Sequence, residues 1–66
     1  MSIVKIVEIS ASSPDSFEDA IRNGVSRAGE TLDNIRGAWV AEQKVVIEEG
    51  EIVEFRTDLK LSFELE

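Results

Sequence analysis

The sequence predicts a small α+β domain with the element order β-α-β-β, in which a three-stranded antiparallel sheet carries one helix on one face. Three features predict it: a β-branched apolar opening segment, a middle segment with helical spacing, and a closing segment with strict alternation. Sixty-six residues are enough for one domain only. We therefore treat residues 1–66 as a single domain.

The opening of the chain predicts a strand followed by the start of a helix. Residues 3–9 are apolar and β-branched at most positions, which favours a strand. Ser13 is a good N-cap residue, Pro14 suits the first helical position, and Asp15 complements the positive end of the helix dipole. These signals predict a helix that begins at Pro14.

The middle segment predicts one amphipathic helix over residues 14–32. Its apolar side chains recur every three or four residues, at Phe17, Ala20, Ile21, Val25, Ala28 and Leu32. Gly24 and Gly29 lie near this apolar stripe, although glycine weakens an isolated helix. Their position predicts a close approach of the helix to the sheet.

The second half of the chain predicts a long β-hairpin. Residues 36–48 read as a strand whose apolar parity shifts near Gln43, which predicts a β-bulge there. A turn follows over residues 48–51, where Gly50 is free to adopt a positive φ. In the last strand six side chains alternate strictly with polar ones, and they are Phe55, Thr57, Leu59, Leu61, Phe63 and Leu65.

The size of the chain predicts self-association. One helix is too small to cover a sheet with two long strands, so one sheet face and the strand edges need another partner. A core of this size roughly balances the entropy of folding, and the chain has no Cys with which to form a disulfide. We therefore expect a homo-oligomer.

Composition and charge exclude several functions. Seven basic side chains face 14 acidic ones, and this net charge of −7 disfavours binding to nucleic acid or to an anionic membrane surface. The absence of His and Cys excludes zinc fingers and Cys–His nucleophiles. No apolar run approaches the roughly 18 residues of a membrane span, and no signal-peptide pattern opens the chain. We expect a cytoplasmic protein.

With this element order, the sequence resembles the dodecins. The residues that carry the resemblance are Ser12 to Asp15, Ala20-Ile21, the segment from Arg27 to Asn34, Glu42-Gln43, and the closing strand from Leu59 to Leu65. The similarity covers nearly the whole chain and has no gap from Thr31 to Leu65. It implies a bacterial or archaeal type of protein in which twelve chains form a hollow sphere, and in which many members bind flavin.

The resemblance also implies where a flavin would bind, and this sequence differs at both positions. In flavin-binding members a Trp at the start of the second strand stacks on the isoalloxazine ring, and Gly37 stands at the aligned position. A Gln on the third strand bonds to the polar edge of the ring, and Arg56, which follows Phe55, stands at its aligned position. Arg has donors but no acceptor, so it does not replace an amide group for group.

Three nearby residues each leave two interpretations open. Trp39 lies two residues after Gly37 and thus on the same strand face, where its indole either stacks on a planar ligand or fills a contact between subunits. Arg56 either binds a phosphate or the edge of a flavin, or pairs with an acid such as Glu42. Gln43 is either a polar ligand contact or an interface amide.

The acidic turn from Glu48 to Glu51 offers the oxygen ligands that Ca²⁺ and Mg²⁺ prefer, but it lacks EF-hand spacing. It is either a solvated turn or part of an ion site that several chains complete around a symmetry axis. The sequence alone identifies no metal ligand.

Three functional hypotheses follow. The first is a non-enzymatic hollow homododecamer that binds and stores a flavin-type cofactor (riboflavin or FMN), with Gly37, Trp39, Gln43 and Arg56 as candidate binding residues. The second is a similar shell that has lost flavin binding and serves as a structural or divalent-ion assembly of the calcium type. The third is an enzyme, and we predict against it because the chain has neither His, Cys nor a Gly-rich phosphate loop after a strand.

Overall fold

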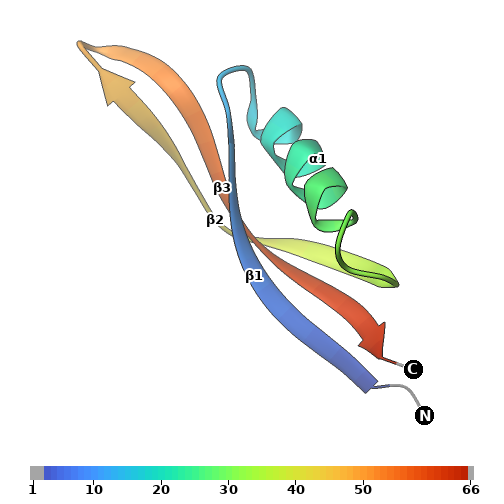
Figure 1. The fold of residues 1–66 in the computed structure, drawn as a ribbon. Helices are drawn as coiled ribbons and strands as arrows, with labels where there is room; N and C mark the ends of the chain where they lie inside the picture. The colour runs from blue at the N-terminus through green and yellow to red at the C-terminus, as the bar shows by residue number, and fades with distance from the viewer. Residues whose placement is uncertain (1–2, 66) are drawn as a thin grey trace.

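The computed structural model describes residues 3–65 and confirms the predicted β-α-β-β order. Its elements are β1 (Ile3–Ser13), α1 (Phe17–Ala28), β2 (Ile35–Glu48) and β3 (Glu51–Leu65) (Figure 1). The three strands form one antiparallel sheet in the order β1-β3-β2. The molecule is long and narrow, with Cα extents of 51 × 19 × 14 Å.

The core lies between α1 and the central strand β3. The alternation along β3 sends every second side chain toward the helix, and Thr57, Leu59 and Leu61 are at most 1% exposed. Ala20 on the facing side of α1 is fully buried. The helix packs against β1 and β3. The strict alternation of the closing segment therefore results from the burial of one face of β3 beneath the helix.

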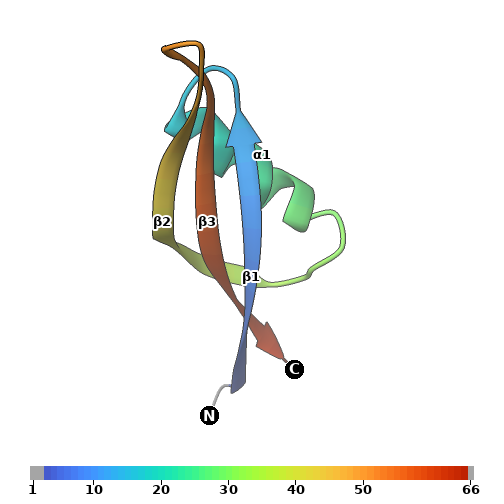
Figure 2. The same ribbon diagram turned by 90° about the vertical axis from the view of Figure 1, so that its left-hand side faces the viewer.

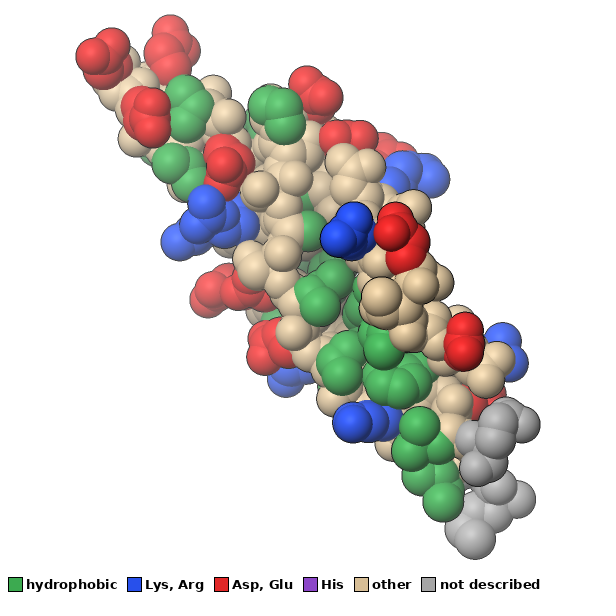
Figure 3. Space-filling view, viewed as in Figure 1, with side chains coloured by type: hydrophobic (Ala, Val, Ile, Leu, Met, Phe, Trp, Pro, Cys, Tyr) green, Lys and Arg blue, Asp and Glu red, His purple; other side chains and the backbone are tan. Residues whose placement is uncertain are grey.

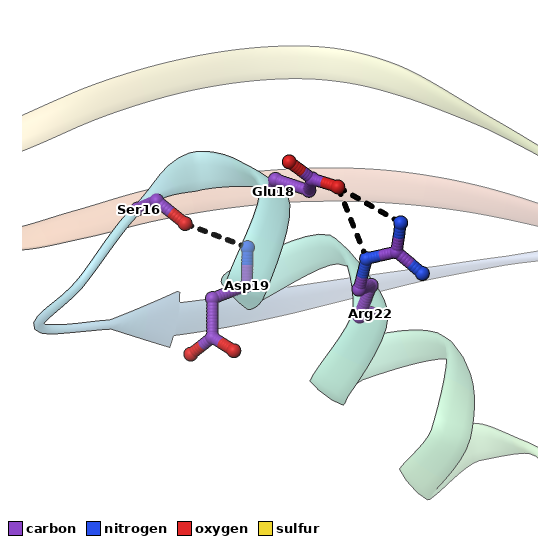
Figure 4. A network of polar contacts seen from close by, with 4 residues as sticks. All are labelled: Ser16, Glu18, Asp19 and Arg22. Atoms are coloured by element: carbon purple, nitrogen blue, oxygen red, sulfur yellow. Dashed lines mark hydrogen bonds and ion pairs between the residues drawn. The ribbon is translucent and has the colours of Figure 1, made fainter.

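The predicted helix start was wrong by three residues. Ser16 is the N-cap, and its Oγ accepts a 2.9 Å hydrogen bond from the backbone N–H of Asp19 (Figure 4). The first strand is longer than predicted and continues through Ser13, which pairs with Phe55 of β3. Because Ser13 is the last residue of β1, it cannot also cap the helix, and Pro14 lies in the connecting bend.

The predicted helix end was also wrong, because α1 stops at Ala28 and not at Leu32. Gly29 is the C-cap residue, and the backbone then turns through hydrogen bonds from Thr31 N and Leu32 N to the carbonyl of Ala28, at 3.1 and 2.9 Å. The two helical glycines therefore differ. Gly24 is buried against the sheet, as predicted, whereas Gly29 is exposed.

The hairpin of β2 and β3 contains the predicted β-bulge, close to the predicted position at Gln43. The register shifts between Val40 and Glu42, which places a bulge at Ala41, two residues before the predicted position. Glu48 pairs with Glu51, so the loop consists of Glu49 and Gly50. Both have positive φ, 51° and 79°, as a type I′ turn requires.

The helix N-terminus is tied to the hairpin by aromatic packing. The rings of Phe17 on α1 and Phe55 on β3 meet edge to face, with centroids 5.2 Å apart and planes at 78°. Glu18 and Arg22 form an exposed ion pair of 2.8 Å on the outer side of the same helix (Figure 4).

In residues 3–65, no helix has the length and apolar character needed to cross a membrane.

Candidate functional site

The sheet face opposite α1 carries three of the four predicted binding residues, Gly37, Trp39 and Arg56, whereas Gln43 pairs with the buried Thr57 and so lies at a helix-side position of the register. We call the face opposite α1 the open face and define it by the even-numbered residues of β3 from Glu54 to Glu64 and by the residues that pair with them. Figure 2 views the sheet from this side, with the helix behind the strands. Charged side chains alternate in sign along its middle, because β3 contributes Arg56, Asp58 and Lys60.

Trp39 and Gly37 both lie on this open face, as their spacing predicts. Trp39 pairs with Lys60 and its side chain is 47% exposed, while Gly37 pairs with Ser62. A Cβ at Gly37 would lie 3.1 Å from the Ser62 hydroxyl, which itself donates to the Gly37 carbonyl at 3.4 Å. The strand therefore presents one accessible indole beside a position without a side chain.

Arg56 also lies on the open face, where it pairs with Ser12 of β1 and Lys44 of β2. The expectation that it bonds to an acid across the sheet was wrong about the partner. Its guanidinium donates two hydrogen bonds to the carboxylate of Glu54, two residues earlier on the same strand. In the register of the strands, Glu42 lies opposite Asp58 and not opposite Arg56. The Arg56 guanidinium is thus held along β3 by Glu54.

Arg56 and Gln43 border a shallow hollow of about 170 Å³. All the residues that line it are polar or charged, namely Ser10, Glu42, Gln43, Lys44, Arg56 and Asp58. Four of these residues were not predicted as site residues, namely Ser10, Glu42, Lys44 and Asp58. The alternation along β3 marks Asp58 as facing the same side as Arg56, but only the register between strands places Ser10 and Glu42 beside it.

Within one chain the four predicted residues form two groups and not one. Trp39 and Gly37 lie toward the end of the sheet where β3 terminates, and Arg56 and Gln43 lie at the hollow. Trp39 pairs with Lys60, four residues along β3 from Arg56, which is about 13 Å at roughly 3.3 Å per residue. A ligand that touches both groups therefore spans the open face or lies between two copies.

The described residues of a single chain contain no group of three or more acidic side chains that could hold a metal ion. Glu48 and Glu51 are paired across the hairpin, and Glu49 lies between them in the loop. The acidic turn is therefore an exposed negative tip.

Comparison with known proteins agrees with this fold. The Dodecin family model matches residues 3–66. Calcium dodecin of Mycobacterium tuberculosis is 35% identical over 65 residues, which cover 98% of this chain and 92% of that protein. Its crystal structure, described as having a novel calcium-binding site, superposes with a TM-score of 0.85 at 36% identity, covering 98% and 93% of the two chains.

Two further solved structures are similar over almost the whole chain. Dodecin from Streptomyces coelicolor has a TM-score of 0.94 and 34% identity, covering 98% of this chain and 93% of that one. Dodecin from Streptomyces davaonensis has a TM-score of 0.93 and 31% identity, covering 98% and 96%. The order of elements, the sheet and these similarities agree, and the chain belongs to the dodecin family.

Proposed function

We propose that this chain is a non-enzymatic binding protein that assembles into a hollow homododecamer and holds a planar, flavin-type cofactor between its copies. The observation that carries the proposal is Trp39, whose indole is 47% exposed on the sheet face opposite the helix. A large aromatic side chain in this position either contacts another copy or stacks on a flat ligand. A ligand enclosed between two copies satisfies both.

The roles of the four candidate residues follow from their places on the sheet. Trp39 stacks on the ring system, an interaction worth roughly 1–3 kcal/mol per ring in comparable base–aromatic contacts. Gly37, two residues before the indole on the same face, contributes no side chain there. Arg56 and Gln43 border the polar hollow and supply donors for the polar edge or the phosphate of a ligand. Stacking shields the excited state of the cofactor and keeps it out of solution.

Symmetric assembly supplies what one chain lacks. Trp39 and Arg56 lie about 13 Å apart on one open face, roughly four residues along β3. In a pair of copies that face each other, the indole of one copy would lie near the hollow of the other. The same contact covers the open face, which a single helix on the other side leaves in need of a partner.

Quenching of flavin fluorescence tests this proposal. Riboflavin and FMN are titrated with the purified protein, and the expected result is saturable quenching. Trp39→Ala should abolish it, and Trp39→Phe, which keeps a smaller ring, should retain part of it. Val40→Ala, at the next position on the strand, is the matched control and should bind like the parent chain. Emission that stays unquenched at high protein concentration overturns the flavin proposal.

A second candidate function is the binding of divalent cations by the same assembly. Two observations favour it: one relative carries the name calcium dodecin, and this chain has 14 acidic side chains against seven basic ones. Since a single chain offers no group of three acids among its described residues, the site would join carboxylates of several copies. The expected signature is a melting temperature that rises with Ca²⁺ or Mg²⁺ and not with flavin.

A control separates a specific cation site from general screening of charge. Magnesium and calcium are compared with NaCl at matched ionic strength, because salt alone weakens repulsion among exposed carboxylates. A melting temperature that rises equally with all three salts counts against the ionic function.

A further inference from the structure

The far end of the β2–β3 hairpin is an apolar arm without cover in its own chain. We define the arm as residues 46–53, which lie beyond the last β1–β3 pair, Ser13 with Phe55. Ile47 and Ile52 are direct cross-strand partners and are 59% and 54% exposed. Since a two-stranded hairpin is marginally stable alone, and exposed apolar pairs mark contact surfaces, the arm needs a partner.

The arm is also strongly acidic. Residues 46–53 carry three Glu residues and no Lys or Arg. Glu48 and Glu51 are directly opposite each other, an arrangement of like charges that destabilises a hairpin. Figure 3 shows hydrophobic and acidic side chains together at this end of the molecule. The arm therefore suits a surface that is apolar and carries a positive charge.

A groove of about 550 Å³ between α1 and the outer edge of β1 has these properties. Its lining is Ile9, Ser10, Ala11, Asn23, Gly24, Arg27, Ala28 and Thr31. Among the described residues that line it, Arg27 is the charged one, and its side chain is 84% exposed. The contact of Arg27 with Glu30 is 3.7 Å, which is longer than a hydrogen bond.

The arm and the groove of one chain lie at opposite ends of the helix. The arm begins past the end of β1, close to the N-terminus of α1 (Figure 1). In the groove, Arg27 and Ala28 belong to the last turn of α1, and Thr31 follows that turn. The arm therefore has to enter the groove of a different molecule. Such a contact is heterologous, so each copy has one arm to donate and one groove to fill. Repetition of the contact builds a ring when the rotation between copies closes.

We propose that the acidic apolar arm of one copy docks into the Arg27 groove of the next, with Ile47 and Ile52 against the apolar lining and the Glu48–Glu51 tip beside the guanidinium. This contact rests on the self-assembly proposed above and names the surfaces that would build it. In this contact, the opposite charges of Arg27 and Glu51 determine which surfaces of two copies meet.

Reversal of charge tests the contact. Arg27→Glu and Glu51→Arg should each raise the chain concentration at which half of the assembly dissociates by tenfold or more, measured by sedimentation velocity. The chain with both substitutions should recover most of the parent value, because the pair of charges is restored in the opposite sense. Arg22→Glu, on the same helix but bound to Glu18 outside the groove, is the matched control and should leave assembly unchanged.

Cross-linking provides an independent readout that keeps these charges intact. The chain has no Cys, so a disulfide between introduced residues is unambiguous. Chains with Thr31→Cys, mixed with chains with Ile52→Cys, should form a covalent heterodimer under mild oxidation. Chains with Glu18→Cys, on the exposed side of the helix, should not cross-link with Ile52→Cys.

The outcomes separate this inference from the proposed function. If the parent chain assembles while the two charge reversals change nothing, or while the Thr31–Ile52 disulfide fails to form, the docking contact is wrong and the assembly stands. If the double reversal does not recover assembly, Arg27 and Glu51 do not meet. If the parent chain is a folded monomer, both proposals fail together.

Discussion

The hydroxyl of Ser13 donates a 2.6 Å hydrogen bond to the Asp19 carboxylate and joins the end of β1 to the first turn of α1. Ser13 is only 2% exposed, and its oxygen also accepts a 2.9 Å hydrogen bond from Asp15 N. The same carboxylate accepts a hydrogen bond from the side-chain amide of Asn23. This short connection fixes the direction in which the helix leaves the sheet.

Ser13→Ala should lower the free energy of unfolding by about 1–3 kcal/mol, since it leaves the half-buried Asp19 carboxylate and the Asp15 N–H without the Ser13 hydroxyl. Ser12→Ala, one residue away on an exposed position, is the control and should change stability by less than about 0.5 kcal/mol. Urea unfolding at one fixed chain concentration measures both, because the stability of an oligomer depends on concentration. Equal effects of the two substitutions would contradict this role of Ser13.

Gly24→Ala should destabilise the protein although alanine is the better helix former. A Cβ at this position would lie 2.9 Å from the Cβ of Ala11, a short side chain that moves only with its backbone, so we expect a loss of about 1–3 kcal/mol. At Gly29 a Cβ would meet only carbonyl oxygens of its own helix, at 3.4 and 3.5 Å, and φ is −65°. Gly29→Ala should therefore be neutral or stabilising by up to about 1 kcal/mol. A loss at Gly29 as large as that at Gly24 would refute the difference.

Thr57→Val should stabilise the protein. Thr57 is fully buried on β3, and its hydroxyl has no hydrogen-bond partner among the described residues. A buried hydroxyl without a partner costs about 1–3 kcal/mol, and valine has nearly the same shape, so we expect a gain of about 1 kcal/mol. Thr57→Ser keeps the hydroxyl and removes a methyl group, and should cost about 1 kcal/mol. If valine lowers the melting temperature, the hydroxyl is bonded in the folded protein and this account of the core is wrong.

Glu49→Asn should also raise stability, by about 0.5 kcal/mol. Glu49 has a φ of 51° in the two-residue loop, a conformation that costs most L-residues about 1–2 kcal/mol and that Asn tolerates better. Glu49→Gln is the control, since it removes the charge without supplying the turn preference. A thermal melt of both variants separates the two effects. Equal gains would assign the effect to charge and not to the turn.

The strands of this fold were predictable from the sequence because the signal is local. Along β3 from Phe55 to Leu65, the polarity of each side chain indicates which face of the sheet it occupies. The two-residue spacing of Gly37 and Trp39 likewise placed both residues correctly on one face. The helix start was not predictable in this way. Ser13 and Ser16 are equally good capping residues, and the choice between them is made by the pairing of Ser13 with Phe55, more than 40 positions away.

The candidate site was predictable only in part for the same reason. Arg56 and Gln43 were selected from sequence, and they do share one hollow. Ser10 and Asp58 meet there because β1 pairs with β3 across the whole intervening chain, and no short-range pattern fixes that register. The sequence analysis considered only acids on neighbouring strands as partners of Arg56. It therefore missed Glu54, which lies on the same strand.

We propose that copies of this chain cover the open face and the edges of a sheet that its own helix cannot cover. Sedimentation velocity of the purified protein at micromolar concentration, without added ligand, is the sharpest test of this assembly. We expect one compact species at twelve times the mass of the chain. A folded species at the mass of a single chain would contradict the assembly and, with it, every site placed between copies.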